Sequence, residues 1–217
     1  MGLNEDRLEN AAHDRHSIVL VPFSTPGVTV LRNIPIMGHH SPDGHCEVLL
    51  RDVRVPVSNL LGTEEGRGFK QLMEQLPRER LIIAVGGVAT LQRAIDETVA
   101  YVMQRKVMGQ TLMSMQNTRF KLAECQTLAT IARSFVDDCI GRSLRDELDL
   151  TTAAMAKWWV SDAVCKVIDE CLQLFGGYGY MMEYPIARLY ADHRVGRIYG
   201  GSNEVMKELI ARTMERP

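Results

Sequence analysis

The sequence lacks any long apolar stretch and any strong excess of charge. No uninterrupted run of about 18 apolar residues occurs, so the sequence predicts no membrane span. The formal net charge of −2 provides no basic surface of the kind that binds nucleic acid or an anionic membrane. With 46% hydrophobic and 24% charged residues, the composition is that of an ordinary globular protein.

Cysteine pairs with metal-binding or redox spacing are also missing. The five cysteines form no CxxC pair, and their odd number argues against a disulfide framework. Cys125, Cys139 and Cys165 fall within helical apolar patterns, so we expect reduced core thiols in a reducing compartment. The first ten residues are acidic and polar, unlike a signal or transit peptide. We therefore expect a cytoplasmic protein, or one of the mitochondrial matrix if the source is eukaryotic.

The first part of the chain is rich in β-forming residues. Four segments have strand composition, namely residues 16–22, 28–31, 46–50 and 52–55. Four short strands are too few to close a sandwich or barrel, and an unpaired edge invites association. We therefore interpret residues 1–61 as the C-terminal part of a middle β domain.

From residue 62 onward the apolar residues recur with a period near 3.6, which is typical of helices. We expect a long first helix that ends at Gly109 and whose start is disturbed by Pro77. A second helix should cover residues 116–144, and a third should run from a cap at Asp149 or Thr151 to Gly176. Pro185 should open a short fourth helix, and the last should begin at Ser202 or Asn203. Long helices with short connections pack as antiparallel bundles. The predicted fold class is mainly α, an antiparallel four-helix bundle over residues 62–217, preceded by a short β segment that is the remnant of a β domain.

One loop collects potential metal ligands. His39, His40, Asp43, His45 and Cys46 lie within eight residues and could hold zinc. Their spacing matches no zinc pattern, and a Pro-Asp-Gly turn naturally collects polar residues. We therefore predict no metal site.

Two glycine pairs permit more than one interpretation. The stretch Gly176-Gly177-Tyr178 could let backbone N–H groups approach a phosphate, or could simply end a helix in a tight turn. It does not follow a strand, so it is no dinucleotide fingerprint. Gly200-Gly201 likewise could be a plain loop before the last helix.

Glu79 lies between Arg78 and Arg80, immediately before a long apolar helical pattern. On these residues alone it could be a solvated or ion-paired carboxylate of a first helical turn. It could also face an apolar cavity, where a carboxylate can serve as a general base.

The order of several short motifs resembles the acyl-CoA dehydrogenase family, most closely its long-chain and isovaleryl-type branch. The similarity runs from about His16 to the end of the chain. The motifs are Arg54-Val55-Pro56, Gly66-Arg67-Gly68-Phe69, Glu79-Arg80, Gln104-Arg105-Lys106-Val107-Met108-Gly109, Met155-Ala156-Lys157, Gln173-Leu174-Phe175-Gly176-Gly177-Tyr178-Gly179-Tyr180, Tyr184-Pro185-Ile186 and Ile198-Tyr199-Gly200-Gly201-Ser202-Asn203-Glu204.

The resemblance implies an N-terminal helical domain, a middle β domain and a C-terminal four-helix bundle, assembled as a homodimer or homotetramer. It implies FAD as cofactor, an acyl-CoA thioester as substrate and an electron-transferring flavoprotein as electron acceptor. The N-terminal domain and the start of the β domain have no counterpart in this sequence, so we expect the isolated chain to be incomplete as an enzyme.

The resemblance also assigns the catalytic base. Most members of the family place a glutamate where this sequence has Gly200, and a minority place it before the arginine of the first bundle helix. That second position is Glu79, so the glycine and the glutamate together favour Glu79 as the base.

The other roles follow position by position. Arg80, Tyr199 and Gly200 would border the substrate. The residues that would contact FAD are Arg105, Met108, Gln116, Gln173, Gly176, Gly177, Ser202 and Glu204. The expected function is FAD-dependent α,β-dehydrogenation of an acyl-CoA. The alternative is a non-catalytic module that binds the nucleotide end of flavin or drives oligomerisation.

Overall fold

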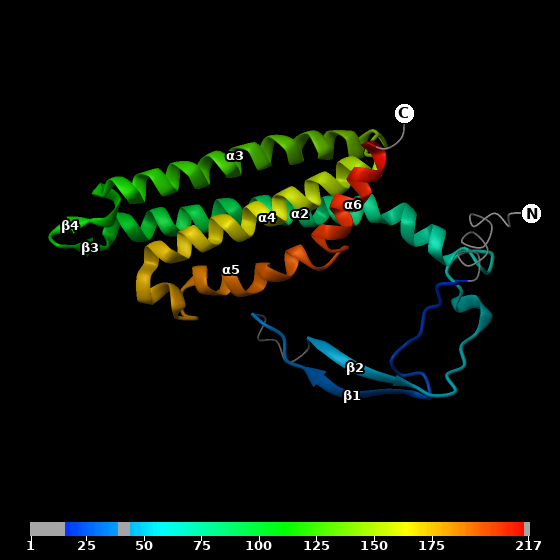
Figure 1. Ribbon diagram of the computed structural model, residues 1–217. Coiled ribbons are helices and arrows are strands. Elements are labelled where there is room, and N and C mark those ends of the chain that lie inside the picture. Colours follow the sequence, from blue (N-terminus) through cyan, green and yellow to red (C-terminus); the bar gives the residue numbers. More distant parts are fainter. Residues whose placement is uncertain (1–15, 39–43, 215–217) are drawn as a thin grey trace, which may run out of the picture. The chain divides into compact units, whose positions relative to one another are not determined.

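The computed structural model describes residues 16–38 and 44–214. These form two compact units, residues 16–36 with 44–76 and residues 37–38 with 77–214. The elements in chain order are β1 (Val28–Ile34), β2 (His45–Leu50), η1 (Val57–Asn59), α2 (Gly68–Gln104), β3 (Lys106–Val107), β4 (Gln110–Thr111), η2 (Leu112–Ser114), α3 (Gln116–Leu144), α4 (Leu150–Phe175), η3 (Gly176–Tyr180), α5 (Pro185–His193), η4 (Arg194–Arg197) and α6 (Asn203–Met214) (Figure 1). The predicted domain boundary between residues 61 and 62 remains a prediction.

The sheet of the first unit is a single antiparallel pair, β1 with β2, whose register shifts between Val30 and Arg32. The four-strand expectation is wrong at residues 16–22 and 52–55. Residues 16–22 pair only through two isolated bridges, His16 with Arg67 and Val19 with Leu60, and these do not form a continuous ladder. Residues 52–55 begin at Asp52, whose φ of +50° breaks the extended conformation.

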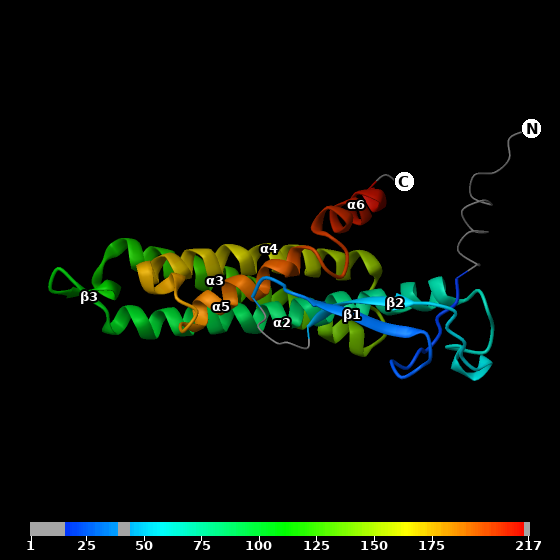
Figure 2. The same cartoon turned by 90° about the horizontal axis from the view of Figure 1, so that it is seen from below.

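The second unit is the predicted antiparallel bundle. From Pro77 onward α2 runs alongside α3, α4 and α5, and consecutive helices run in opposite directions in both views (Figures 1 and 2). The expectation that Pro77 would disturb the start of the first helix is not met as stated, since α2 begins at Gly68 and continues through Pro77. The short helix α6 packs against α4.

The core follows from the helical periodicity of the sequence. Small residues such as Ala84, Ala132 and Ala156 are fully buried and let the helices approach closely. Cys125, Cys139 and Cys171 are buried free thiols, while Cys46 and Cys165 are half-buried and also free. The predicted core position is confirmed for Cys125 and Cys139 and is wrong for Cys165, while the reduced state stays a prediction.

Three helix ends lie at the capping residues predicted from the sequence. Asp149 precedes α4, and its Oδ1 accepts a hydrogen bond from the Thr152 N–H at 2.8 Å. Gly176 ends α4 with φ +59°, and Pro185 opens α5. Among residues 16–38 and 44–214, no helix has both the length and the hydropathy needed to cross a bilayer.

Candidate functional site

Glu79 and Arg80 are neighbours in α2 but differ in burial. Glu79 is exposed, whereas Arg80 is only 4% exposed. The Arg80 Nε donates to the carbonyl oxygen of Gly200 at 3.5 Å, so α2 contacts the loop before α6. Burial lowers the pKa of Arg80, and the charge of Glu79 opposes that shift. The Arg80 Nη1 is buried and has no hydrogen-bond partner in the described part of the chain.

The loop that Arg80 contacts requires glycine. Gly200 has φ +64° and Gly201 has φ +90°, in the left-handed region that other residues rarely adopt. A Cβ at position 200 would also lie 2.5 Å from Cδ1 of Ile83, so that side chain would have to move. A glutamate at position 200 would therefore need both a strained backbone and a displaced neighbour.

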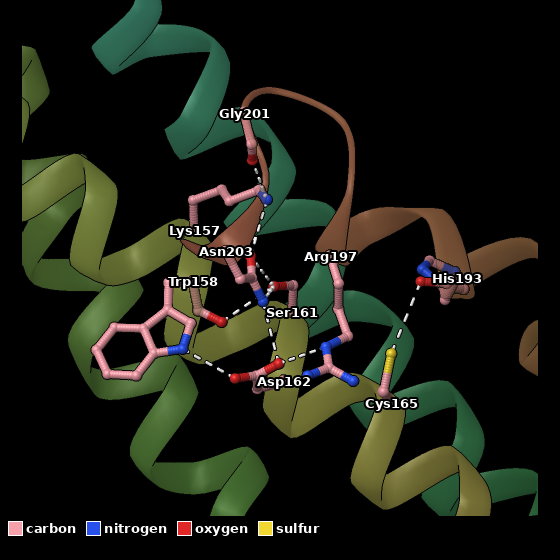
Figure 3. Close-up of polar contacts among 9 residues, drawn as sticks. All are labelled: Lys157, Trp158, Ser161, Asp162, Cys165, His193, Arg197, Gly201 and Asn203. Carbon is pink, nitrogen blue, oxygen red and sulfur yellow. Dashed lines mark hydrogen bonds and ion pairs between the residues drawn. The ribbon is translucent and has the colours of Figure 1, made fainter. Parts of the chain in front are cut away.

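Lys157 of α4 holds the same loop from the interior. Its side chain is fully buried, and Nζ donates to Gly201 O at 2.6 Å and to Asn203 Oδ1 at 2.9 Å (Figure 3). Burial lowers the pKa of Lys157, and the positive charge of Arg80 adds to the effect. Two buried cations thus donate to the carbonyls of two consecutive glycines, and this fixes the path of the loop.

Asn203 extends this polar network toward η4. Its Nδ2 donates to Ser161 Oγ and to Asp162 Oδ1, both at 3.0 Å (Figure 3). Asp162 also accepts from Arg197 Nε at 2.6 Å and from Trp158 Nε1 at 2.8 Å. The last helix was expected to begin at Ser202 or Asn203; Asn203 is its first residue and is buried, with 1% exposure, at the centre of this network.

An apolar cavity of about 280 Å³ lies beside the loop. It is lined by Ile82, Ile83, Gly86, Gly87, Ser161, Val164, His193, Gly196 and Tyr199. Burial lowers the pKa of His193, which favours the neutral imidazole. Tyr199, predicted to border the substrate, therefore lies at a cavity suited to an apolar group.

A second cavity lies at the other end of the bundle, next to the β3–β4 hairpin. It has a volume of about 750 Å³, and four of the predicted cofactor residues line it, namely Arg105, Gln173, Gly176 and Gly177. The Arg105 guanidinium lies 5.6 Å from the ring centre of Tyr178. A Cβ built on Gly176 or Gly177 would meet nothing within 4 Å, so packing does not require glycine there. An open glycine pair beside an arginine suits a phosphate-bearing ligand.

Two further predicted cofactor residues lie near this end. Met108 occupies the turn of the hairpin with φ +51° and is 96% exposed. Gln116 is the first residue of α3 and is exposed. Neither lines the cavity, although Met115 and Asn117 do.

Ser202 and Glu204 are separate from these six residues. They lie at the start of α6, where Ser202 Oγ accepts from the Val205 N–H at 3.4 Å. Backbone and Ser202 hydrogen bonds lower the pKa of Glu204. Arg80 contacts the loop before α6, and Arg105 lines the cavity beside the hairpin. The α-helical rise of 1.5 Å per residue separates these two positions by roughly 37 Å. The predicted cofactor residues of one chain therefore form two distant groups.

In the described residues, no group of three His, Cys, Asp or Glu side chains is placed to hold a metal ion. His39, His40 and Asp43 of the loop that collects ligands lie outside those residues. His45 and Cys46 belong to β2.

Lys157 and Arg197 belong to the polar network around Asn203 but are not among the site residues predicted from the sequence. For Lys157 a signal existed, because positions 157, 160, 164, 167 and 171 follow the helical period and the other four are apolar. A lysine on a buried stripe predicts an internal partner for its charge. Arg197 had no such signal.

Residues 66–215 match the family described as "Acyl-CoA dehydrogenase, C-terminal domain". The long-chain specific acyl-CoA dehydrogenase of Mus musculus mitochondria is 45% identical over 196 residues, which cover 90% of this chain and 45% of the relative. A crystal structure of an acyl-CoA dehydrogenase from Geobacillus kaustophilus is 41% identical with a TM-score of 0.90, covering 94% of this chain and 53% of that one. The structure of butyryl-CoA dehydrogenase from Megasphaera elsdenii is 34% identical with a TM-score of 0.85, covering 92% of this chain and 52% of that one.

The helical unit is thus an acyl-CoA dehydrogenase C-terminal domain. The chain belongs to the acyl-CoA dehydrogenase family, and it spans about half the length of the relatives it matches.

Proposed function

We propose that this chain takes part in the FAD-dependent α,β-dehydrogenation of an acyl-CoA thioester, with Glu79 as the base that removes the α-proton. The observation that supports this most directly is the contact between Arg80 and Gly200. It brings the helix that bears Glu79 to a loop that requires glycine where most of the family have the base.

The helical geometry gives Glu79 a reason to face the substrate. Ile82 and Ile83 follow it by three and four positions, so all three share one face of α2. Both isoleucines line the apolar cavity. An acyl chain in that cavity would therefore have its thioester end within reach of the Glu79 side of the helix.

The chemistry requires Glu79 to be shielded from water during the reaction. The α-proton of a thioester is weakly acidic, and a desolvated carboxylate is a stronger base than a hydrated one. The described residues leave Glu79 exposed. We propose that bound substrate and cofactor supply the cover.

The proposed reaction removes two hydrogens and two electrons from the substrate. The α C–H bond breaks with its proton going to Glu79, the β hydrogen leaves as hydride, and the electron pair of the α C–H bond forms the new double bond. FAD, when bound, supplies N5 as the hydride acceptor, and an electron-transferring flavoprotein would receive the electrons in turn.

The two groups of predicted cofactor residues suggest how FAD would be held. Arg105, Gln173, Gly176 and Gly177 offer a cation and open backbone to its pyrophosphate. Ser202 and Glu204 would border another part. Because the groups lie at opposite ends of one bundle, we propose that they serve different FAD molecules in a homodimer or homotetramer.

A second candidate is a non-catalytic flavin-nucleotide-binding or oligomerisation module. The observation that favours it is the exposure of Glu79, together with the separation of the two residue groups in one chain. In that case the chain would bind the nucleotide end of flavin without oxidising a thioester.

The absorbance spectrum of the purified chain with FAD separates the two. The dehydrogenase predicts a protein-bound flavin spectrum that bleaches when acyl-CoA is added without oxygen. The same assay on the chain fused behind the N-terminal half of a relative tests whether further residues are needed. Bound flavin that no acyl-CoA bleaches, in either form, would favour the module and contradict the dehydrogenase.

A further inference from the structure

Three glycines line the apolar cavity, and they are glycines for different reasons. A Cβ on Gly87 would lie 2.6 Å from Cγ1 of Val160, so helix packing requires Gly87. A Cβ on Gly86 would meet nothing within 4 Å. A Cβ on Gly196 would make only ordinary contacts, the nearest at 3.7 Å to Ser161. Packing therefore explains one of the three glycines.

Backbone conformation does not explain the other two. Neither Gly86 nor Gly196 is among the residues with positive φ. Gly86 lies inside α2, where glycine is less favourable than alanine because it loses more conformational freedom on folding. What the two positions share is that both face the cavity, where a methyl group would take up space.

Exposed and buried residues line the cavity together: Gly86 lies on its exposed side and Gly196 is buried. Ile82 and Tyr199 are exposed, whereas Val164 is buried. The Thr90 hydroxyl lies within hydrogen-bond distance of both Gly86 O, at 3.0 Å, and His193 Nε2, at 2.8 Å. His193 also lines the cavity, and the absence of side chains at Gly86 and Gly196 leaves room there for an apolar ligand.

We infer that this cavity receives the distal methylenes of an aliphatic acyl chain, and that Gly86 and Gly196 set how far the chain enters. The inference rests on the proposed function for its ligand class and adds the positions that determine chain length. Both glycines lie on the wall, one on α2 and one on η4. A methyl group at either position would shorten the space without disturbing the helices.

The test measures the dissociation constants of butanoyl-, octanoyl-, dodecanoyl- and hexadecanoyl-CoA for the chain by calorimetry. The variants are Gly86→Ala and Gly196→Ala, with Gly141→Ala as the control. Gly141 is also a helical glycine with room for a methyl group, its Cβ lying 3.4 Å from an Arg145 nitrogen, but it is on α3 away from the cavity. Circular dichroism and melting temperatures confirm that each variant is folded.

In the wild type and in Gly141→Ala, we expect affinity to rise about fourfold for each methylene that enters. In Gly86→Ala and Gly196→Ala the rise should stop one or two methylenes earlier, so the longest bound chain loses about fourfold to sixteenfold. Butanoyl-CoA should bind equally well to all four proteins.

Equal length dependence in all four proteins overturns the inference, and so does the absence of acyl-CoA binding at every length. The measurement needs no turnover. If flavin bleaching fails while length-dependent binding changes as predicted, the proposed dehydrogenation is wrong and the cavity assignment holds.

Discussion

Lys157→Met is a sharp perturbation because it removes one buried charge and keeps most of the side-chain volume. Lys157 Nζ donates to Gly201 O and Asn203 Oδ1. Without it, Asn203 Oδ1 keeps Ser161 Oγ at 3.2 Å, but Gly201 O loses the donor described for it. An unsatisfied buried acceptor costs about 1–3 kcal/mol. We therefore expect the free energy of unfolding to fall by about 1–3 kcal/mol.

A second effect acts in the opposite direction. Burial and Arg80 both lower the pKa of Lys157, so its charge is itself costly, and that cost is relieved in Lys157→Met. Urea unfolding followed by circular dichroism measures the sum. Lys166→Met, an exposed lysine of the same helix, is the control and should change stability by less than about 0.5 kcal/mol. A Lys157→Met protein as stable as the wild type would contradict the prediction that the lost hydrogen bonds outweigh the relieved charge cost.

Three other changes test separate parts of the structure. Asp149→Ala should lower stability by about 0.5–2 kcal/mol in urea unfolding, because the cap on Thr152 N–H is lost. Burial lowers the pKa of His193 from its ordinary value of 6.5, so at lower pH the unfolded chain binds more protons than the folded one. Wild-type stability should therefore fall as the pH drops below 6.5. His193→Gln should remove the contribution of this histidine to the slope of stability against pH between about pH 5 and pH 8. Gly87→Ala should cost about 1–3 kcal/mol through its clash with Val160, measured by thermal melting.

The helices could be predicted from sequence because their signals are local. The cap at Asp149, the proline that opens α5 and the apolar period of α4 each act within one or two turns. The resemblance then gave the order of the elements and the family, both of which the structure and the relatives support.

The secondary-structure predictions failed where pairing between two segments determines the conformation. Residues 16–22 have strand composition, but a strand also needs a continuous ladder with a neighbouring segment, and that cannot be read from one segment. The β3–β4 hairpin was missed because its turn places a methionine, Met108, at positive φ before Gly109, instead of the asparagine or aspartate that usually marks such turns.

The sequence predicted several residues of the candidate site but not the hydrogen bonds that join them. Sequence alone paired Glu79-Arg80 with the Gly200 loop through the resemblance. It did not reveal that Lys157 and Arg80 hold consecutive carbonyls, because that depends on how α2, α4 and the loop pack. Nor does the sequence reveal that Gly87 packs closely against Val160 of α4 while a Cβ on its neighbour Gly86 would meet nothing within 4 Å.

Rapid-mixing measurement of flavin bleaching by acyl-CoA tests most directly whether Glu79 is the base. The experiment compares the wild type with Glu79→Gln and with Glu74→Gln, an exposed glutamate of the same helix, in the form of the protein that binds FAD. Because a positioned general base contributes about 10²–10⁴-fold, we predict that Glu79→Gln bleaches at least a hundredfold more slowly while FAD stays bound, and that Glu74→Gln bleaches at the wild-type rate. A wild-type bleaching rate in flavin-loaded Glu79→Gln would contradict the central claim.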